Sequence, residues 1–235
     1  MTGPSAAAGD APAGDGRAQI LARIRAATGP LARGDTGVDA AYAALPREYL
    51  RAHHDTGPED IADLFAERAA DYRAVVERVP ESGLADAVAR VLTARAEAGP
   101  GGPFVVPGGL PGSWLAGLPA VIELARDTPP LSAAELDRTA GVVTGCAVAI
   151  AETGTIILDH GLGQGRRALT LVPDFHLVIV RAGQVAADLA DAFARLDPAR
   201  PHTLISGPSA TSDIELIRVE GVHGPRQLHV LLAAP

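Results

Sequence analysis

The residues best suited to chemistry lie close together near the carboxyl-terminal end of the sequence. They are two carboxylates, Asp213 and Glu215, followed by His223 and Arg226. A carboxylate or an imidazole can transfer protons, and a guanidinium pairs with the oxygens of an anion. This grouping favours a binding or catalytic site for a small anionic molecule.

The elements that would position these residues follow from the local pattern. An apolar run at 203–205 is followed by a turn at 206–209, a polar helix start at 211–215, a glycine turn at 221–225 and an apolar run at 228–232. The pattern predicts strand, loop, helix, loop and strand. A site at the loops is one interpretation, because glycine-flanked polar clusters at strand ends often hold ligands in α/β proteins. The alternative is a well-capped surface helix between two strands.

Within this helix, Ser212 and Glu215 have the spacing of a capping box. The free N–H groups at a helix start favour an anion nearby. Because residues two apart face different sides of a helix, we expect Asp213 to face the cleft and Glu215 to cap the helix.

A second polar cluster interrupts two apolar runs at Glu152, Thr153 and Gly154. Glu152 could act as acid, base or nucleophile, or it could form a structural ion pair with an arginine. Arg167, in the pair Arg166-Arg167, could bind an anion or simply be solvated. We expect residues 151–155 and 207–226 to meet in one cleft at the carboxyl ends of strands, as in open α/β sheets.

Other patterns are weaker. The glycines of 161–165 fit neither the dinucleotide-binding nor the Walker spacing, and a hairpin loop is the better interpretation. The adjacent His53 and His54 would face different ways, and His223 and His229 lack zinc-like spacing. The sequence therefore predicts no metal site.

Composition excludes several functional classes. With 235 residues, the chain can form one large or two small domains, and its net charge of −8 argues against nucleic acid as the main partner. The single cysteine, Cys146, excludes a disulfide framework or a self-contained iron–sulfur site, and its apolar surroundings indicate a core residue. Because the sequence shows neither a signal peptide nor an apolar membrane span, we expect a soluble, cytoplasmic protein.

The spacing of apolar residues along the rest of the chain predicts an α/β fold. We expect a mostly parallel sheet flanked by helices, with the N-terminal helices packed on it. Residues 1–17 have the composition of a disordered tail, and residues 31–57 that of a loop. Helices are expected over 18–28, from Pro58, around 84–98, at 132–138 (where Ser132 and Glu135 form a capping box) and over 185–196. Strands are expected at 103–107, 121–124, 141–150, 155–158 and 175–180, with a turn anchored by Trp114.

Three runs of the sequence resemble the LUD domain family, and within it the lactate utilization protein C group. They are GVVTGCAVAIAETGTIIL (141–158), RRALTLVPDFHLVIV (166–180) and SGPSATSDIELIRVEGVHGPRQLHV (206–230). The resemblance covers about 18–235, which implies a single domain with a helical part at 18–98 and an α/β core at 99–235. It also implies a fold similar to the ribose-phosphate isomerase and CoA-transferase group.

The resemblance places several residues on family motifs. Glu152, Asp213 and His223 become candidate catalytic residues. The candidate ligand-binding residues are Thr153, Gly154, Arg167, Gly207, Ser209, Thr211, Gly221, Gly224 and Arg226. The sequence departs from the family pattern at Ala147, where an acidic residue is expected, and at Ala210, where an arginine is expected.

Two functional hypotheses follow. The resemblance implies a part in oxidising L-lactate to pyruvate, alongside a cysteine-rich subunit and an iron–sulfur subunit. In that case this chain would be a non-redox component that binds a small carboxylate or a partner. It would bind no cofactor itself, and the iron–sulfur clusters would belong to the partners. The alternative is a stand-alone enzyme of the isomerase, CoA-transferase or cyclo-ligase type, with Glu152 as base or nucleophile.

Overall fold

The computed structural model describes residues 16–28, 36–46, 57–99, 101–211, 219–220 and 224–235. It divides into two units, Met1–Tyr49 and Leu50–Pro235. The first unit contains helices α1 (Gly16–Thr28) and α2 (Thr36–Ala43). All the elements described below belong to the second unit.

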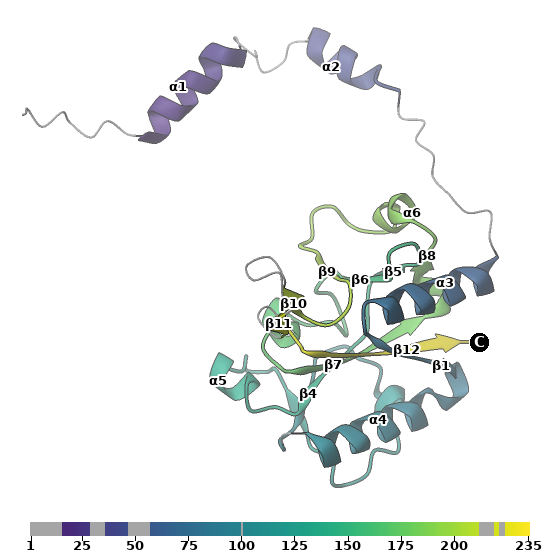
Figure 1. The fold of residues 1–235 in the computed structure, drawn as a ribbon. Coiled ribbons are helices and arrows are strands. Elements are labelled where there is room, and N and C mark those ends of the chain that lie inside the picture. Colours follow the sequence, from purple (N-terminus) through teal and green to yellow (C-terminus); the bar gives the residue numbers. More distant parts are fainter. Residues whose placement is uncertain (1–15, 29–35, 47–56, 100, 212–218, 221–223) are drawn as a thin grey trace, which may run out of the picture. The chain divides into compact units, whose positions relative to one another are not determined.

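The second unit is built on a six-stranded sheet in which every pair of neighbouring strands is parallel (Figure 1). The order across the sheet is β1 (Val75–Pro80), β12 (Gln227–Ala234), β7 (Phe175–Arg181), β4 (Gly141–Thr144), β2 (Phe104–Val106) and β3 (Leu124–Arg126). Strands β12 and β7 are therefore central. Their apolar residues are covered on both faces, as a parallel sheet requires.

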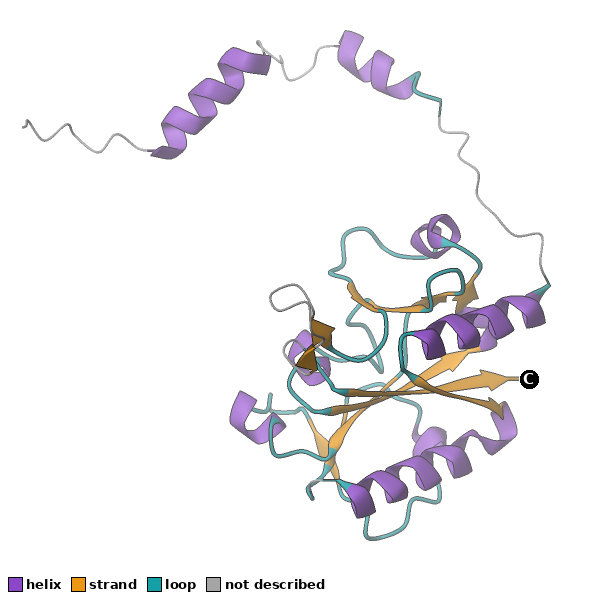
Figure 2. Ribbon diagram, in the orientation of Figure 1, coloured by secondary structure: helices purple, strands orange, loops and turns teal. Residues whose placement is uncertain are grey.

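Alternate residues of β7 face two different hydrophobic cores. Leu177 and Ile179 pack with α4 (Leu84–Ala98), whereas Val178 and Val180 pack with α3 (Pro58–Asp71). Helices therefore cover both faces of the sheet (Figure 2). Helix α3 begins with Pro58 in its first turn, followed by Glu59 and Asp60, where the helix dipole favours negative charge.

A four-stranded sheet lies on the α3 side of the central strands. Its order is β8 (Val185–Ala186), β5 (Val148–Ile150), β6 (Thr155–Leu158) and β9 (Thr203–Ile205). Residues of β5, β6 and β8 share one core with α3, β7 and β12. Helix α6 (Leu189–Ala194) packs on β5 and β8. A short antiparallel pair, β10 (Ala210–Thr211) and β11 (Val219–Glu220), follows β9.

The smaller helical elements lie in the connections between strands. Helix α5 spans Ala133–Leu136, and 3-10 turns occur as η1 (Glu81–Gly83), η2 (Gly112–Leu115), η3 (Arg167–Thr170) and η4 (Ala182–Gln184). The expected capping box is present, because the Ser132 hydroxyl accepts from the Glu135 amide and the Glu135 carboxylate accepts from the Ser132 amide. Trp114 of η2 is buried, as expected.

The structure confirms the α/β class and the parallel sheet flanked by helices, but it corrects several boundaries. Residues 141–150 form two strands in different sheets, and 185–196 form β8 and then the shorter α6. Helix α2 lies where a loop was expected, and α1 includes Gly16 and Arg17, which were assigned to the tail. Strand β1 was not predicted, and β3 begins at the last residue of the expected strand.

Candidate functional site

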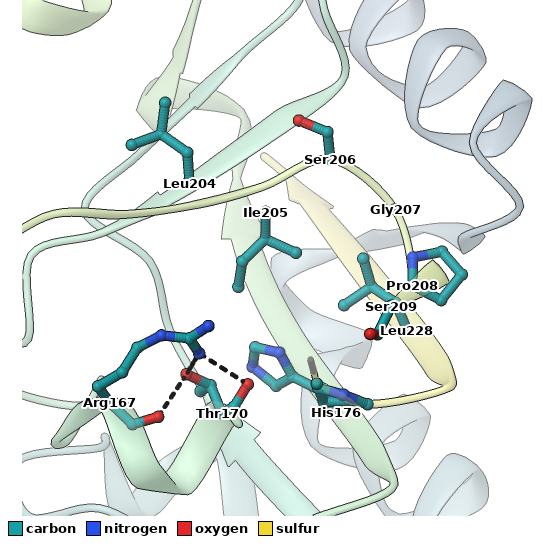
Figure 3. A pocket seen from close by; sticks show the side chains of 12 residues that line it. Arg167, Thr170, His176, Leu204, Ile205, Ser206, Gly207, Pro208, Ser209 and Leu228 are labelled. Carbon is teal, nitrogen blue, oxygen red and sulfur yellow. Dashed lines mark hydrogen bonds between the residues drawn. The ribbon is translucent and has the colours of Figure 1, made fainter. Parts of the chain in front are cut away.

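A cavity of about 250 Å³ lies between the two sheets, in the second unit. Its walls come from η3, the start of β7, the end of β9 and the loop after it, and the segment leading into β12 (Figure 3). The lining residues are Arg167, Thr170, His176, Leu204, Ile205, Ser206, Gly207, Pro208, Ser209, Gly224, Pro225 and Leu228. His176 and Leu228 are near the amino ends of β7 and β12. Residues 151–155 follow the carboxyl end of β5 and the loop from Ser206 follows that of β9, as expected, but in the central sheet the cavity lies at the amino ends of β7 and β12.

Arg167 brings a positive charge to the cavity. Its Nη1 donates to the carbonyl oxygen of Thr170 at 3.1 Å and to the Thr170 hydroxyl at 3.3 Å. These contacts hold the guanidinium at one end of η3 and involve neither Nη2 nor Nε. No Asp or Glu is among the described residues that line the cavity. The arrangement suits an anion, because a guanidinium can donate two parallel hydrogen bonds to a carboxylate.

His176 lies beside this charge and is almost completely buried. Its Nε2 is 2.7 Å from the hydroxyl oxygen of Thr144, the last residue of β4. Burial, and then the positive charge of Arg167, lower the pKa of His176 to about 3. The ring is therefore neutral at ordinary pH and carries one donor nitrogen and one acceptor nitrogen.

The loop after β9 forms the opposite wall. Gly207 has φ +81, and a Cβ added there would lie 2.5 Å from the Tyr72 carbonyl oxygen. The amide of Ser209 donates to the carbonyl of Pro225 at 2.8 Å. These two contacts fix the loop against the end of α3 and against the segment that leads into β12. Gly224 lies in the same segment and also lines the cavity.

The predicted Glu152-Thr153-Gly154 cluster is connected to this wall through hydroxyl groups. The Thr153 hydroxyl donates to the Thr155 hydroxyl at 2.7 Å, which is 2.8 Å from the hydroxyl of Ser206. Residues 151–155 therefore contact the start of the loop after β9 at Ser206, whereas their meeting with residues 207–226 in one cleft stays a prediction. However, Glu152 and Thr153 are exposed and do not line the cavity, and Gly154 is buried against α3.

Four of the candidate ligand-binding residues line the cavity together: Arg167, Gly207, Ser209 and Gly224. Arg226 does not. It pairs with Asp174, which Arg95 also approaches at 3.6 Å, and it lines a separate groove.

The remaining candidates lie at the edge of the described chain or beyond it. Thr211 belongs to strand β10 and not to a helix start, so that part of the prediction is wrong. Asp213, Gly221 and His223 lie outside the described residues, as do Ser212 and Glu215 of the predicted capping box and the pair His53-His54. Their predicted roles stay predictions, as does the catalytic role of Glu152.

The sequence interpretation overlooked three polar residues of the cavity: Thr170, His176 and Ser206. His176 carried a recognisable signal, because it is the one ionisable side chain within the apolar residues of β7 before Arg181. A buried polar group in such a strand needs a partner, which here is Thr144. The partner comes from a strand more than thirty residues earlier, so the sequence alone did not reveal it.

Three further predictions concern Cys146, the glycines at 161–165 and the absence of a metal site. Burial raises the pKa of the Cys146 thiol to about 12, which suits the expected core residue. The glycines at 161–165 form a loop between β6 and η3, but not a hairpin, because β6 and β7 belong to different sheets. Within the described ranges, no group of three His, Cys, Asp or Glu side chains could hold a metal ion. The absence of a metal site stays a prediction.

The comparisons with known proteins identify the family. The model of the LUD domain matches residues 134–233. A protein of Deinococcus radiodurans named lactate utilization protein C is 45% identical over 204 residues, which are 84% of this chain and 92% of that protein. The chain belongs to the lactate utilization protein C family. Its LUD domain contains every residue that lines the cavity.

Two further relatives match over shorter stretches. A lactate utilization protein C of Bacillus pumilus is 36% identical over 35% of this chain and 38% of its own length. An uncharacterized Escherichia coli protein, YkgG, is 39% identical over 32% and 36%. A crystal structure of a DUF162 family protein from Deinococcus radiodurans matches with a TM-score of 0.62 and 41% identity, covering 76% of this chain and 99% of that one. This likeness supports the α/β architecture of the LUD domain.

Proposed function

We propose that this chain is a component of an L-lactate utilization system. The observation that carries the proposal is the 45% identity, over most of both chains, with a protein named for lactate utilization. We further propose that the chain acts in the cytoplasm. Among the described helices, none is long and apolar enough to cross a bilayer.

Within this system, the chain binds a small carboxylate in the cavity beside Arg167. The guanidinium supplies the matching charge, with Nη2 and Nε not engaged by Thr170. Ile205 and Leu228 give the cavity an apolar side, which suits a short alkyl group. A volume of about 250 Å³ equals roughly eight water molecules at 30 Å³ each, so the ligand is small.

The chain itself carries no electrons in this proposal. Oxidation of lactate to pyruvate removes two electrons, which usually pass to a cofactor. An iron–sulfur cluster needs about four ligands, mostly cysteines, whereas this chain has Cys146 alone, and its thiol is buried. Partner subunits rich in cysteine and holding iron–sulfur clusters would accept the electrons.

The alternative, an isomerase, CoA-transferase or cyclo-ligase that uses Glu152, gains no support from the described geometry. Glu152 is exposed and lies outside the cavity. In the described part of the chain, the hydroxyl groups of Thr153, Thr155 and Ser206 connect its turn to the cavity wall.

Two measurements on purified material test the proposed function. We expect the isolated chain to be colourless, to contain no stoichiometric iron, and to reduce no artificial electron acceptor in the presence of L-lactate. Lactate-dependent dye reduction should appear when cysteine-rich and iron–sulfur partners, recovered by affinity purification from the native host, are added. A stoichiometric chromophore, or turnover by the isolated chain, would show that the electron carrier lies in this chain.

A further inference from the structure

A groove lies between α4 and the start of β12, on the face of the central sheet opposite the cavity. Side chains alternate along a strand, so Phe175 of β7 faces α4 whereas His176 lines the cavity. In β12, Gln227 likewise lines the groove and Leu228 the cavity. The groove consists of two hollows of about 300 and 500 Å³ that share Arg95 and Gln227, and we call it the α4 groove.

Two buried nitrogens in the α4 groove lack a hydrogen-bond partner. Among the described residues, three buried side-chain nitrogen or oxygen atoms have none, and two of the three, Arg95 Nη2 and His229 Nε2, belong to lining residues of the smaller hollow. Asp174 approaches Arg95 Nη2 at 3.6 Å, and Glu77 approaches His229 Nε2 at 3.4 Å. Both contacts are too long for a good hydrogen bond. Unmet buried polar atoms cost free energy, so a ligand that bonds to both is favoured.

The other guanidinium nitrogens of Arg95 are engaged by the protein, and its side chain is only 9% exposed. Nε donates to the carbonyl oxygen of Ala140 at 3.3 Å, and Nη1 donates to Gln227 Oε1 at 3.2 Å. The guanidinium carbon lies 5.3 Å from the centre of the Phe175 ring. Each edge of the guanidinium that contains Nη2 therefore shares one nitrogen with a protein oxygen. This disfavours the two parallel hydrogen bonds that a planar carboxylate makes with an arginine.

The charge of Arg95 is not matched by a hydrogen-bonded carboxylate, in contrast to the other arginines of the groove. Arg90 binds Glu77 through both terminal nitrogens. Arg226 donates to Asp174 through Nε. Arg95 has only the long contact with Asp174. The α4 groove therefore holds one buried positive charge that suits an anion.

The smaller hollow is the better place for an anion. It is lined by both Arg95 and His229, and no Asp or Glu is among the described residues that line it. The carboxylates of Asp137 and Asp174 line the larger hollow instead, where they would repel an anion. Gln227 is exposed at the strand start. Rotation of its side chain therefore costs little, and it widens the hollow over the two buried nitrogens.

We propose that the smaller hollow of the α4 groove is a second anion site, which binds a phosphate group. The tetrahedral oxygens accept a hydrogen bond from Arg95 Nη2 and form another with His229 Nε2, so that the two bonds come from separate elements. A phosphate that keeps a proton can donate as well as accept, and it fits either tautomer of a neutral histidine. This site is independent of the carboxylate proposed beside Arg167, because the central sheet separates the two.

The test is an isothermal titration of the full chain with inorganic phosphate, at constant ionic strength kept with sodium chloride. Arg95→Gln should weaken binding by about tenfold or more, because a charged hydrogen bond is lost. His229→Leu should weaken it by about three- to tenfold, because a neutral one is lost. Arg200→Gln is the matched control, since Arg200 pairs with Asp159 and lines neither hollow. It should bind phosphate as the wild type does.

A phosphate monoester distinguishes the two sources of a phosphate group. Tighter binding of glycerol 3-phosphate than of inorganic phosphate would assign the site to the phosphate of an organic molecule that extends into the larger hollow. Weaker binding would assign it to the inorganic ion. Absence of phosphate binding to the wild type would overturn the inference. So would an affinity that falls in Arg167→Gln and not in Arg95→Gln, because the phosphate would then lie in the cavity.

Nitrogen NMR of labelled histidine in the wild-type chain gives a second measurement, which holds even if Arg95→Gln does not fold. The Nε2 signal of His229 should shift as phosphate binds. His202 is the matched control, since its Nε2 is also buried without a partner among the described residues but lies outside the α4 groove. A His229 signal that stays unchanged, or that moves no more than that of His202, would contradict the inference.

Discussion

At the scale of single residues, the cavity depends on two side chains that differ in how firmly the protein holds them. Arg167 is exposed and, among the described residues, its guanidinium is bonded to Thr170 of its own turn, whereas His176 is buried between β4 and β12 and bonded to Thr144. Replacing Arg167 should therefore change ligand binding and leave stability nearly unchanged. Replacing His176 should affect both.

Arg167→Gln should weaken the binding of any small carboxylate by about tenfold or more, because the opposite charge and two hydrogen bonds are lost. The matched control is Arg166→Gln, since Arg166 pairs with Asp127 and does not line the cavity. Isothermal titration with L-lactate measures both. Equal weakening by both changes would show that general surface charge, and not the cavity, attracts the acid.

The unusual pKa of His176 predicts how stability depends on pH. In the folded chain His176 stays neutral down to about pH 3, whereas an unfolded histidine takes up a proton near 6.5. Between these values the unfolded chain holds more protons. This contribution to stability is therefore full above pH 6.5 and falls as the pH drops toward 3, by up to about 1.4 kcal/mol per pH unit.

Urea unfolding of the wild type and of His176→Gln at pH 7.5 and pH 5 measures this contribution. Paired carboxylates such as Glu77 and Asp127 also lose stabilising interactions in acid, but they do so equally in both proteins. The difference in the free energy of unfolding between the wild type and His176→Gln should therefore be smaller at pH 5 than at pH 7.5. A difference that is independent of pH would mean that His176 titrates normally when folded.

At the scale of elements, the turn between β5 and β6 is shaped by its contact with α3. Gly154 has φ +60, and a Cβ there would lie 2.5 Å from the carbonyl carbon of Arg68 and from the amide nitrogen of Ala69. The backbone of the turn thus packs directly on the backbone of the helix. The same turn leads through Thr155 to the cavity wall, so helix and cavity are connected.

Gly154→Ala should therefore lower the free energy of unfolding by about 1–3 kcal/mol, from backbone strain and the clash with α3. Gly183→Ala is the matched control, since its φ is ordinary and nothing lies within 4 Å of an added Cβ. Gly183→Ala should change the free energy of unfolding by no more than about 0.5 kcal/mol. Chemical denaturation compares the two, and a tolerated Gly154→Ala would refute the close contact with the helix.

Local signals predicted the elements that have clear boundaries. Proline and acidic residues marked the start of α3, glycine the end of α4, and the Ser132 capping box the start of α5. The split of 141–150 was not predictable, because its two halves are equally apolar and only tertiary pairing sends them to different sheets. Strand β1 was missed because its sequence, VVERVP, shows no clear alternation.

The candidate site, like the fold, could be predicted only in part from the sequence. Arg167 and the glycine loops were identified from residue type and turn chemistry, and they do line the cavity. His176, Thr144 and Ser206 were not, because their importance comes from contacts across strands distant in sequence. The place of the cavity, at the amino ends of β7 and β12, follows from the second sheet, which the sequence did not predict.

At the scale of the whole molecule, the four hydrophobic cores are formed entirely by residues of the unit Leu50–Pro235 among those described. Deleting residues 1–49 should therefore leave a cooperatively folding protein whose Tm lies within about 3 °C of the full chain. Its affinity for L-lactate should also be unchanged.

Calorimetry and titration of the shortened chain test this expectation. As a contrast, deletion through Pro80 removes α3 and β1 and should abolish cooperative unfolding. Loss of a cooperative transition on deleting residues 1–49 alone would show that the first unit is required for folding.

The position of β12 has a consequence for synthesis on the ribosome. Among the described strands, β1 pairs with β12 alone, yet Val75 and its partner His229 are separated by about 150 residues. At roughly 5–20 residues per second, β1 waits on the order of ten to thirty seconds for its neighbour. During that time the emerging chain exposes the unpaired edge of β1 and, once β7 has been synthesised, the edge of β7 that later pairs with β12. Yield in a heterologous host should therefore depend on chaperone capacity and on translation speed over the last third of the message.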